Sequence, residues 1–333
     1  MRDIRKELEK RILVMDGAMG TMLQQYKFTE EDFRGERFKD FAYPVQGNND
    51  LLSLTQPKAI AEVHAAYFEV GADIVETNTF SSTTIAMADY HMEDLAYELN
   101  FESARIAKEV AEEFTRKNPE KPRFVAGAMG PTNKTASMSP DVNDPGFRAI
   151  TFDQLRIAYK EQAEGLIEGG SDVLLIETVF DTLNAKAALF AIEEVKEAKG
   201  VDIPIMVSGT ITDASGRTLS GQTPEAFLVS ISHIPLLSVG FNCALGADQL
   251  LPYVKQLAQN TPFYISAYPN AGLPNHFGEY DQTAEEMQAL IKTYLDEHVV
   301  NIIGGCCGTT PDHIKLIADA VKEYKPRKIA ELV

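Results

Sequence analysis

Eight short apolar runs, each followed by a segment with helical periodicity, constrain the fold of this chain more than any other feature. The runs lack a regular alternation of apolar and polar residues, which is typical of parallel strands buried on both faces. They cover residues 12–17, 73–78, 123–130, 172–178, 204–210, 238–244, 262–270 and 299–304. The helical patterns that follow them cover residues 57–70, 92–115, 152–169, 182–198, 223–231, 246–258, 283–297 and 311–324.

Eight strand–helix units in 333 residues predict an α/β fold of the (β/α)8 barrel (TIM barrel) type. The alternative is an open, doubly wound sheet, but no GxGxxG motif follows the first run, which counts against a dinucleotide-binding fold. No linker rich in Gly, Ser or Pro divides the chain. We therefore expect residues 1–325 to form one domain and residues 326–333 to be a tail or the start of a linker to further modules.

The charge of the chain excludes several classes of partner. It has 31 basic and 49 acidic residues, a net charge of −18, which disfavours binding to nucleic acid or to an anionic membrane. No apolar run is long enough to span a bilayer, and the charged segment 1–10 is unlike a signal peptide. An odd, low number of cysteines fits the reducing cytoplasm, which is the location we expect.

All three cysteines lie in two glycine-flanked segments near the end of the chain, Cys243 in the first and the adjacent pair Cys306 and Cys307 in the second. Each segment follows an apolar run, so a barrel brings the three thiols to the rim formed by the C-terminal ends of its strands. Three thiolates with an open fourth position are typical of a catalytic zinc site. The alternatives are cysteines that only pack as small apolar residues, or a strained disulfide within the adjacent pair.

Two connections, residues 20–55 and 130–151, are too long to be simple turns. Both follow predicted strands, so both belong to the face of the barrel that carries the thiols. Loops of this length in a compact domain are usually functional.

Three carboxylates, Asp16, Glu76 and Glu177, are predicted to lie on the same rim as the thiols. Such a group suits a cationic ligand, and an α-ammonium group is a natural candidate. The alternative for Asp16 or Glu177 is a helix cap or a pair with a lysine. Backbone N–H groups of residues 77–80, at a helix start, could bind a carboxylate. The six histidines are scattered, and we interpret them as structural or surface residues.

Several motifs resemble the homocysteine-binding, zinc-containing N-terminal module of cobalamin-dependent methionine synthases, within the homocysteine S-methyltransferase family. The resemblance extends from about residue 10 to residue 322. The matching segments are 15–21 (MDGAMGT), 32–37 (DFRGER), 47–51 (GNNDL), 76–80 (ETNTF), 130–133 (GPTN), 139–144 (SPDVND), 176–178 (IET), 208–213 (SGTITD), 241–245 (FNCAL), 268–274 (YPNAGLP) and 304–310 (GGCCGTT). Segments 47–50 and 139–144 are more similar to the cobalamin-dependent branch than to the branches that use betaine or S-methylmethionine.

The resemblance implies a site and a reaction. Cys243, Cys306 and Cys307 would bind zinc, and Asp16 and Glu177 would bind the amino group of L-homocysteine. Gly17, Thr77, Asn78, Thr79 and Phe80 are the remaining implied substrate contacts. Homocysteine, activated as a zinc thiolate with no protein base, would attack the methyl group of methylcobalamin and give methionine.

Two matters stay open at this stage. The cobalamin-binding and folate-binding modules of such synthases are not in this chain, so it would be a fragment or one subunit of a split system. The alternative functions are methyl transfer from S-methylmethionine or a betaine, and a non-catalytic barrel that binds homocysteine or zinc.

Overall fold

The predicted barrel of eight parallel strands is confirmed by the computed structural model, which describes residues 3–213 and 215–329. The sheet has the order β1-β8-β7-β6-β5-β4-β3-β2, and a parallel bridge between Met15 and Ile74 joins its two ends into a nearly closed barrel. The strands are β1 (Leu13–Val14), β2 (Ile74–Glu76), β3 (Phe124–Met129), β4 (Val173–Val179), β5 (Ile205–Gly209), β6 (Ser238–Gly246), β7 (Tyr264–Asn270) and β8 (Ile302–Ile303).

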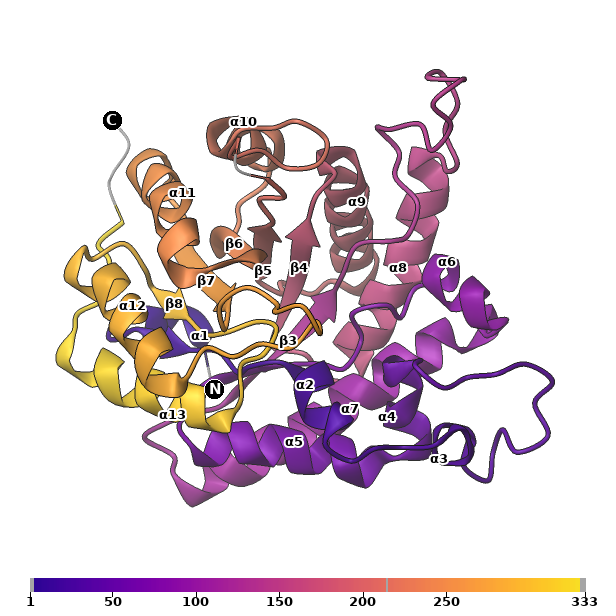
Figure 1. Cartoon of the computed structure of the whole chain (residues 1–333), viewed down its shortest axis with the longest axis horizontal. Coiled ribbons are helices and arrows are strands. Elements are labelled where there is room, and N and C mark those ends of the chain that lie inside the picture. The colour runs from indigo at the N-terminus through magenta and orange to yellow at the C-terminus, as the bar shows by residue number, and fades with distance from the viewer. Residues whose placement is uncertain (1–2, 214, 330–333) are drawn as a thin grey trace.

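One helix of the outer layer follows each strand (Figure 1). These helices are α5 (Pro57–Glu69), α7 (Ala96–Lys117), α8 (Phe152–Glu168), α9 (Thr182–Lys199), α10 (Pro224–Ile231), α11 (Ala247–Asn260), α12 (Ala284–Asp296) and α13 (Pro311–Ala320). Local sequence sets several of their starts: Thr151 and Thr283 cap α8 and α12, and Gln154 and Glu286 complete the capping boxes. Proline at the first turn begins α5, α10 and α13.

The apolar residues separate into two layers, as the strand period of two requires. Leu13 and Met15 belong to the cluster inside the barrel, whereas Val14 packs outward against the helices. Helix α1 (Ile4–Leu8) contributes Ile4 and Leu8 to the interior cluster, so it closes the N-terminal end of the barrel. The C-terminal end of the barrel carries polar residues instead, and the predicted site residues are among them.

The predicted element boundaries were wrong at some ends. Strand β8 has two residues instead of the run 299–304, because the side chain of Asn301 accepts the Ile265 N–H at 2.9 Å in place of a ladder carbonyl. The helical pattern 92–115 begins with a 3-10 turn (Glu93–Leu95) before α7, and the pattern 311–324 ends in another (Val321–Glu323).

The two long connections lie on the C-terminal face of the barrel. Residues 20–55 are not one open loop: they hold α2 (Met19–Gln24), α3 (Glu30–Arg34), a 3-10 turn (Asn49–Leu51) and α4 (Leu52–Thr55). The connection before α8 has no helix or strand between residues 131 and 151, and it projects from the body of the molecule at the upper right of Figure 1. Among the residues that the structure describes, no helix combines the length and the apolar character needed to cross a bilayer.

Part of the segment expected to be a tail packs against the barrel. Arg327 is buried, and its guanidinium donates to the backbone oxygens of Ala258, Thr261 and Phe263. Its own carbonyl accepts from the side chain of Asn301 at 2.8 Å. Residues 330–333 of the predicted tail lie outside the described residues.

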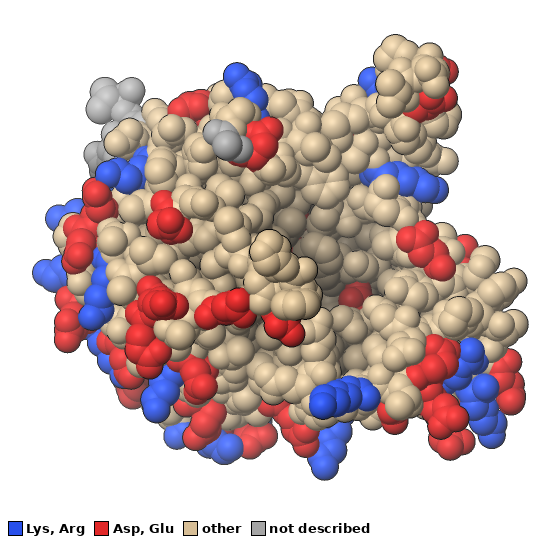
Figure 2. All heavy atoms as spheres, in the orientation of Figure 1, with Lys and Arg blue, Asp and Glu red and all other residues tan. Residues whose placement is uncertain are grey.

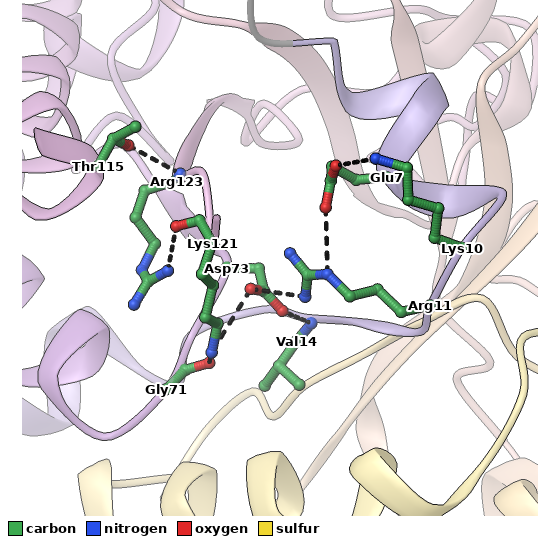
Figure 3. Close-up of polar contacts among 9 residues, drawn as sticks. All are labelled: Glu7, Lys10, Arg11, Val14, Gly71, Asp73, Thr115, Lys121 and Arg123. Carbon is green, nitrogen blue, oxygen red and sulfur yellow. Dashed lines mark hydrogen bonds and ion pairs between the residues drawn. The ribbon is translucent and has the colours of Figure 1, made fainter. Parts of the chain in front are cut away.

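A buried ion pair secures the N-terminal end of the barrel, where β1 meets β2 (Figure 3). The Asp73 carboxylate accepts the Val14 N–H at 2.9 Å and lies 2.9 Å from the Arg11 guanidinium. Lys121 Nζ lies 3.6 Å from the same carboxylate and donates to the Gly71 carbonyl. Only 1% of the Asp73 side chain is exposed, so its charge depends on these partners.

We expect Asp73→Ala to lower the free energy of unfolding by about 3 kcal/mol, because it leaves Arg11 and Lys121 without their buried counter-charge. Urea denaturation followed by circular dichroism measures this. The matched control is Asp202→Ala, since the Asp202 side chain is 79% exposed and pairs with Arg5. The Asp202→Ala substitution should lower the free energy of unfolding by less than about 0.5 kcal/mol. Equal effects of the two substitutions would contradict this role for Asp73.

Candidate zinc and substrate site

The three cysteine sulfur atoms converge on one point of the rim. Cys243 lies in β6, and Cys306 and Cys307 follow β8. Their Sγ atoms all lie within 4.8 Å of one another, and Cys243 and Cys307 are 3.8 Å apart. A tetrahedral zinc ion with Zn–S bonds of ~2.3 Å places its sulfur ligands about 3.8 Å apart. The spacing therefore fits one zinc ion with its fourth position open, and all three thiols are free of disulfides.

Unusual backbone at both segments makes this convergence possible. Cys243 and Ala244 have φ of 59° and 56°, and the pairing of β6 with β7 shifts register between Asn242 and Gly246. Non-glycine residues seldom adopt this left-handed region. After the adjacent pair, Gly308 has φ of 77°, and a Cβ there would lie 2.3 Å from the Tyr280 Cβ. Only glycine fits that turn.

Neighbouring polar groups act on the thiols. Hydrogen bonds with the thiols of Cys243 and Cys306 lower the pKa of the Cys307 thiol, whereas the pKa values of Cys243 and Cys306 are raised, so Cys307 ionises most readily of the three. The Cys307 N–H donates to Asn270 Oδ1 at 3.2 Å, which fixes the backbone of the pair. Asn242 Nδ2 lies 3.9 Å from Cys306 Sγ and donates toward it.

The predicted carboxylates line the same cavity as the cysteines. Asp16 and Glu177 are almost fully buried, and Asp16 Oδ2 accepts the Glu76 N–H at 3.0 Å. Burial and the charge of Glu76 raise the pKa of Asp16. Burial raises the pKa of Glu76 to about 7, and burial followed by the charges of Glu76 and Asp16 raises that of Glu177. The group therefore favours a cation that could neutralise it.

The segment after β2 offers the cavity free backbone N–H groups, whereas its side chains bond mainly to other parts of the protein. Thr77 and Thr79 hydroxyls bond to one another and to the backbone of Ala128, and Asn78 Nδ2 donates to the Asn49 carbonyl. Among residues 3–213 and 215–329, the N–H groups of Asn78 and Phe80 have no hydrogen-bond acceptor. The expected helix start is wrong here, because α6 (Thr84–Met87) begins later and the free N–H groups belong to a turn.

One cavity of about 350 Å³ joins all these groups, which is within the usual range for small-molecule sites. Figure 2 shows a hollow on this face that is walled mostly by uncharged residues, with many of the charged side chains in view outside it. Every predicted substrate contact and metal ligand lines the cavity. The sequence assigned no role to several other lining residues, although segments 15–21, 47–51 and 176–178 carried part of the family resemblance. These residues are Ala18, Met19, Gly20, Gly47, Asn48, Asn49, Asp50, Ser81, Met87, Tyr90 and Thr178.

The protein is thus a (β/α)8 barrel with a three-cysteine zinc site beside an acidic pocket. The profile of the homocysteine S-methyltransferase family matches residues 13–321. Since this covers most of the chain, the protein belongs to the homocysteine S-methyltransferase family.

Solved structures of the homocysteine methyltransferase MmuM from Escherichia coli share the fold. The oxidised form has a TM-score of 0.72 at 19% identity, covering 93% of this chain and 96% of that one. The metallated form has a TM-score of 0.70 at 22% identity, covering 94% and 97%. The apo form has a TM-score of 0.65 at 22% identity, covering 93% and 96%. At these identities the likeness establishes the fold alone.

The raised pKa of Glu76 makes a prediction about stability. In the metal-free protein the folded state keeps a proton on Glu76 up to about pH 7, whereas an unfolded glutamate loses it near pH 4.5. The stabilisation from this group is therefore present below pH 4.5 and is lost as pH rises to 7. Because Glu76→Gln resembles the protonated form, we expect it to raise Tm at pH 8 and to leave Tm nearly unchanged at pH 4.5.

Scanning calorimetry in a chelating buffer at the two pH values measures this difference. Glu120→Gln is the control, because Glu120 is exposed on a turn far along the chain from the pocket residues. If Glu76→Gln shifted Tm equally at both pH values, burial of an ionised Glu76 would not destabilise the folded protein.

Proposed function

We propose that this protein methylates L-homocysteine to methionine, with the methyl group supplied by methylcobalamin on a module or subunit outside this chain. The observation that carries the proposal is that three thiols and three carboxylates line one cavity. The thiols suit zinc and a substrate sulfur, and the carboxylates suit the ammonium group of an amino acid.

Cys243, Cys306 and Cys307 would hold the zinc ion. When bound, zinc coordinates the substrate sulfur and lowers its pKa, so that the thiolate nucleophile is present at neutral pH. We expect no histidine base for this step, and none of the histidines among the described residues lines the cavity. The three thiolate ligands keep the site electron-rich, which preserves the nucleophilicity of the sulfur.

Asp16 and Glu177 would orient the substrate through its α-ammonium group. Their burial makes an unpaired negative charge costly, so a bound cation both satisfies them and fixes the amino acid. The free N–H groups of Asn78 and Phe80 would bind the α-carboxylate. At Gly17, a Cβ would lie 2.7 Å from the Thr309 carbonyl oxygen, so only glycine allows the close packing behind this part of the cavity wall.

Two features support a cobalamin donor. Segment 47–50, which resembles the cobalamin-dependent branch, lines the cavity. Segment 139–144, which carries the same resemblance, belongs to the connection that projects from the same face (Figure 1). Methylcobalamin would supply the methyl group and keep the bonding electron pair on cobalt, while the substrate sulfur held at Cys243, Cys306 and Cys307 would accept the methyl group.

Turnover of the zinc-loaded chain with three donors tests the proposal. We expect methionine to form from homocysteine and free methylcobalamin, and not from S-methylmethionine or glycine betaine. Cys307→Ala should bind less zinc and lose activity by about 100-fold or more, since it removes a ligand and not only a contact. Activity with S-methylmethionine but not with methylcobalamin would contradict the donor, and activity with none of the three would favour a binding protein.

A further inference from the structure

Asn242 connects the two halves of the site. Its side chain is fully buried, and two residues that it bonds to, Thr178 next to Glu177 and the cysteine Cys306, line the cavity. Oδ1 accepts the Thr178 N–H at 3.1 Å and the Ser208 hydroxyl at 2.6 Å. Nδ2 donates to Thr178 Oγ1 at 2.8 Å and toward Cys306 Sγ at 3.9 Å. All four hydrogen-bonding positions of the amide are therefore used.

The orientation of this amide is fixed by its partners. A backbone N–H can only donate, so the Asn242 atom that faces the Thr178 N–H must be the oxygen. The other amide atom, which faces Cys306 Sγ, is then the nitrogen. An N–H that points at a thiolate stabilises its charge and fixes its direction.

The bonds of Asn242 cross from one bulge of the barrel to another. Thr178 has φ of 54°, and β4 shifts register against β5 between Ile176 and Val179. Cys243 has φ of 59° at the shift of β6 against β7. Strands β4 and β6 are not neighbours, since β5 lies between them. A left-handed β-branched residue is costly, and it persists where its surroundings hold it in place.

We propose that Asn242 is a positioning residue that sets the distance between the thiol cluster and Glu177, and thereby selects homocysteine over cysteine. This inference rests on the proposed function. Glu177 directly precedes Thr178, and Cys243 directly follows Asn242. The Asn242 amide therefore holds the backbone next to Glu177, which would bind the ammonium group, and next to Cys243, which would hold the metal that binds the sulfur. Homocysteine has one methylene more than cysteine between its ammonium group and its sulfur.

A rigid separation gives this selection a physical basis. If neither bulge can move, a thiol that is one methylene too short cannot reach the metal and the carboxylates at once. One missing methylene is worth roughly 10- to 200-fold in discrimination. If the separation can relax, cysteine regains both contacts and the discrimination falls.

The test compares the dissociation constants of homocysteine and cysteine for the zinc-loaded full chain by calorimetry. We expect the wild-type protein to prefer homocysteine by about 10-fold or more. Asn242→Ala should reduce this preference by about 10-fold and weaken zinc binding by about 10-fold. Thr178→Val, which removes only the hydroxyl partner of Nδ2, should also reduce the preference, and Thr178→Ser should retain it.

Asn301→Ala is the matched control. Asn301 is also a fully buried amide that joins elements of the barrel. Its partners, Ile265 and Arg327, do not line the cavity, whereas two partners of Asn242, Thr178 and Cys306, do. Its loss should lower stability and leave the substrate preference unchanged. A merely structural role for Asn242 would make the two asparagine variants alike.

A second readout is independent of substrate. With Co2+ in place of zinc, the sulfur-to-metal absorption bands report the surroundings of the thiolates. Loss of the N–H that points at Cys306 should shift these bands in Asn242→Ala and not in Asn301→Ala.

The outcomes separate the inference from the proposed function. If the wild-type protein does not bind homocysteine, the proposed function fails. If it does, and Asn242→Ala keeps the wild-type preference, the inference alone is overturned. If Asn242→Ala does not fold, Thr178→Val and Thr178→Ser decide: equal preferences in both would overturn the inference.

Discussion

Three sulfur atoms from two separate segments lie within 4.8 Å of one another. This convergence defines the position of a metal ion, and the rest of the site surrounds that position. Barrel closure brings the ends of β6 and β8 to one rim, but closure alone does not direct adjacent cysteines at one point. The left-handed backbone at Cys243 and Gly308 supplies the turns. The thiols are therefore preorganised by the backbone, and the metal has little left to rearrange.

The same rim gathers negative charge in a buried place. Burial raises the pKa of Asp16, Glu76 and Glu177. The charge of Glu76 raises the pKa of Asp16 and Glu177 further, and the nearby Cys307 adds to the shift of Glu177. Such a site is costly without cations. A zinc ion at the thiols and an ammonium group at the carboxylates would remove most of this cost. An amino acid thiol, which brings a cationic group and a sulfur on one short chain, matches both requirements.

Much of this could be predicted from the sequence, because buried parallel strands leave a clear apolar pattern and their C-terminal ends meet on one face. That reasoning placed Cys243 with Cys306 and Cys307. It could not show that Asn242 bonds to Thr178, because the contact depends on register shifts in strands that are not neighbours. The shortened β8 and the turn that replaces a helix start after β2 likewise depend on side chains such as Asn301 and Asn78, which compete for backbone groups.

X-ray absorption at the zinc edge, with and without homocysteine, shows whether the substrate sulfur takes the open coordination position. We expect three sulfur ligands at ~2.3 Å in the zinc-loaded protein and a fourth sulfur at a similar distance when homocysteine is added. Three sulfurs in both samples, although homocysteine is bound, would contradict the claim that the open position belongs to the substrate thiol.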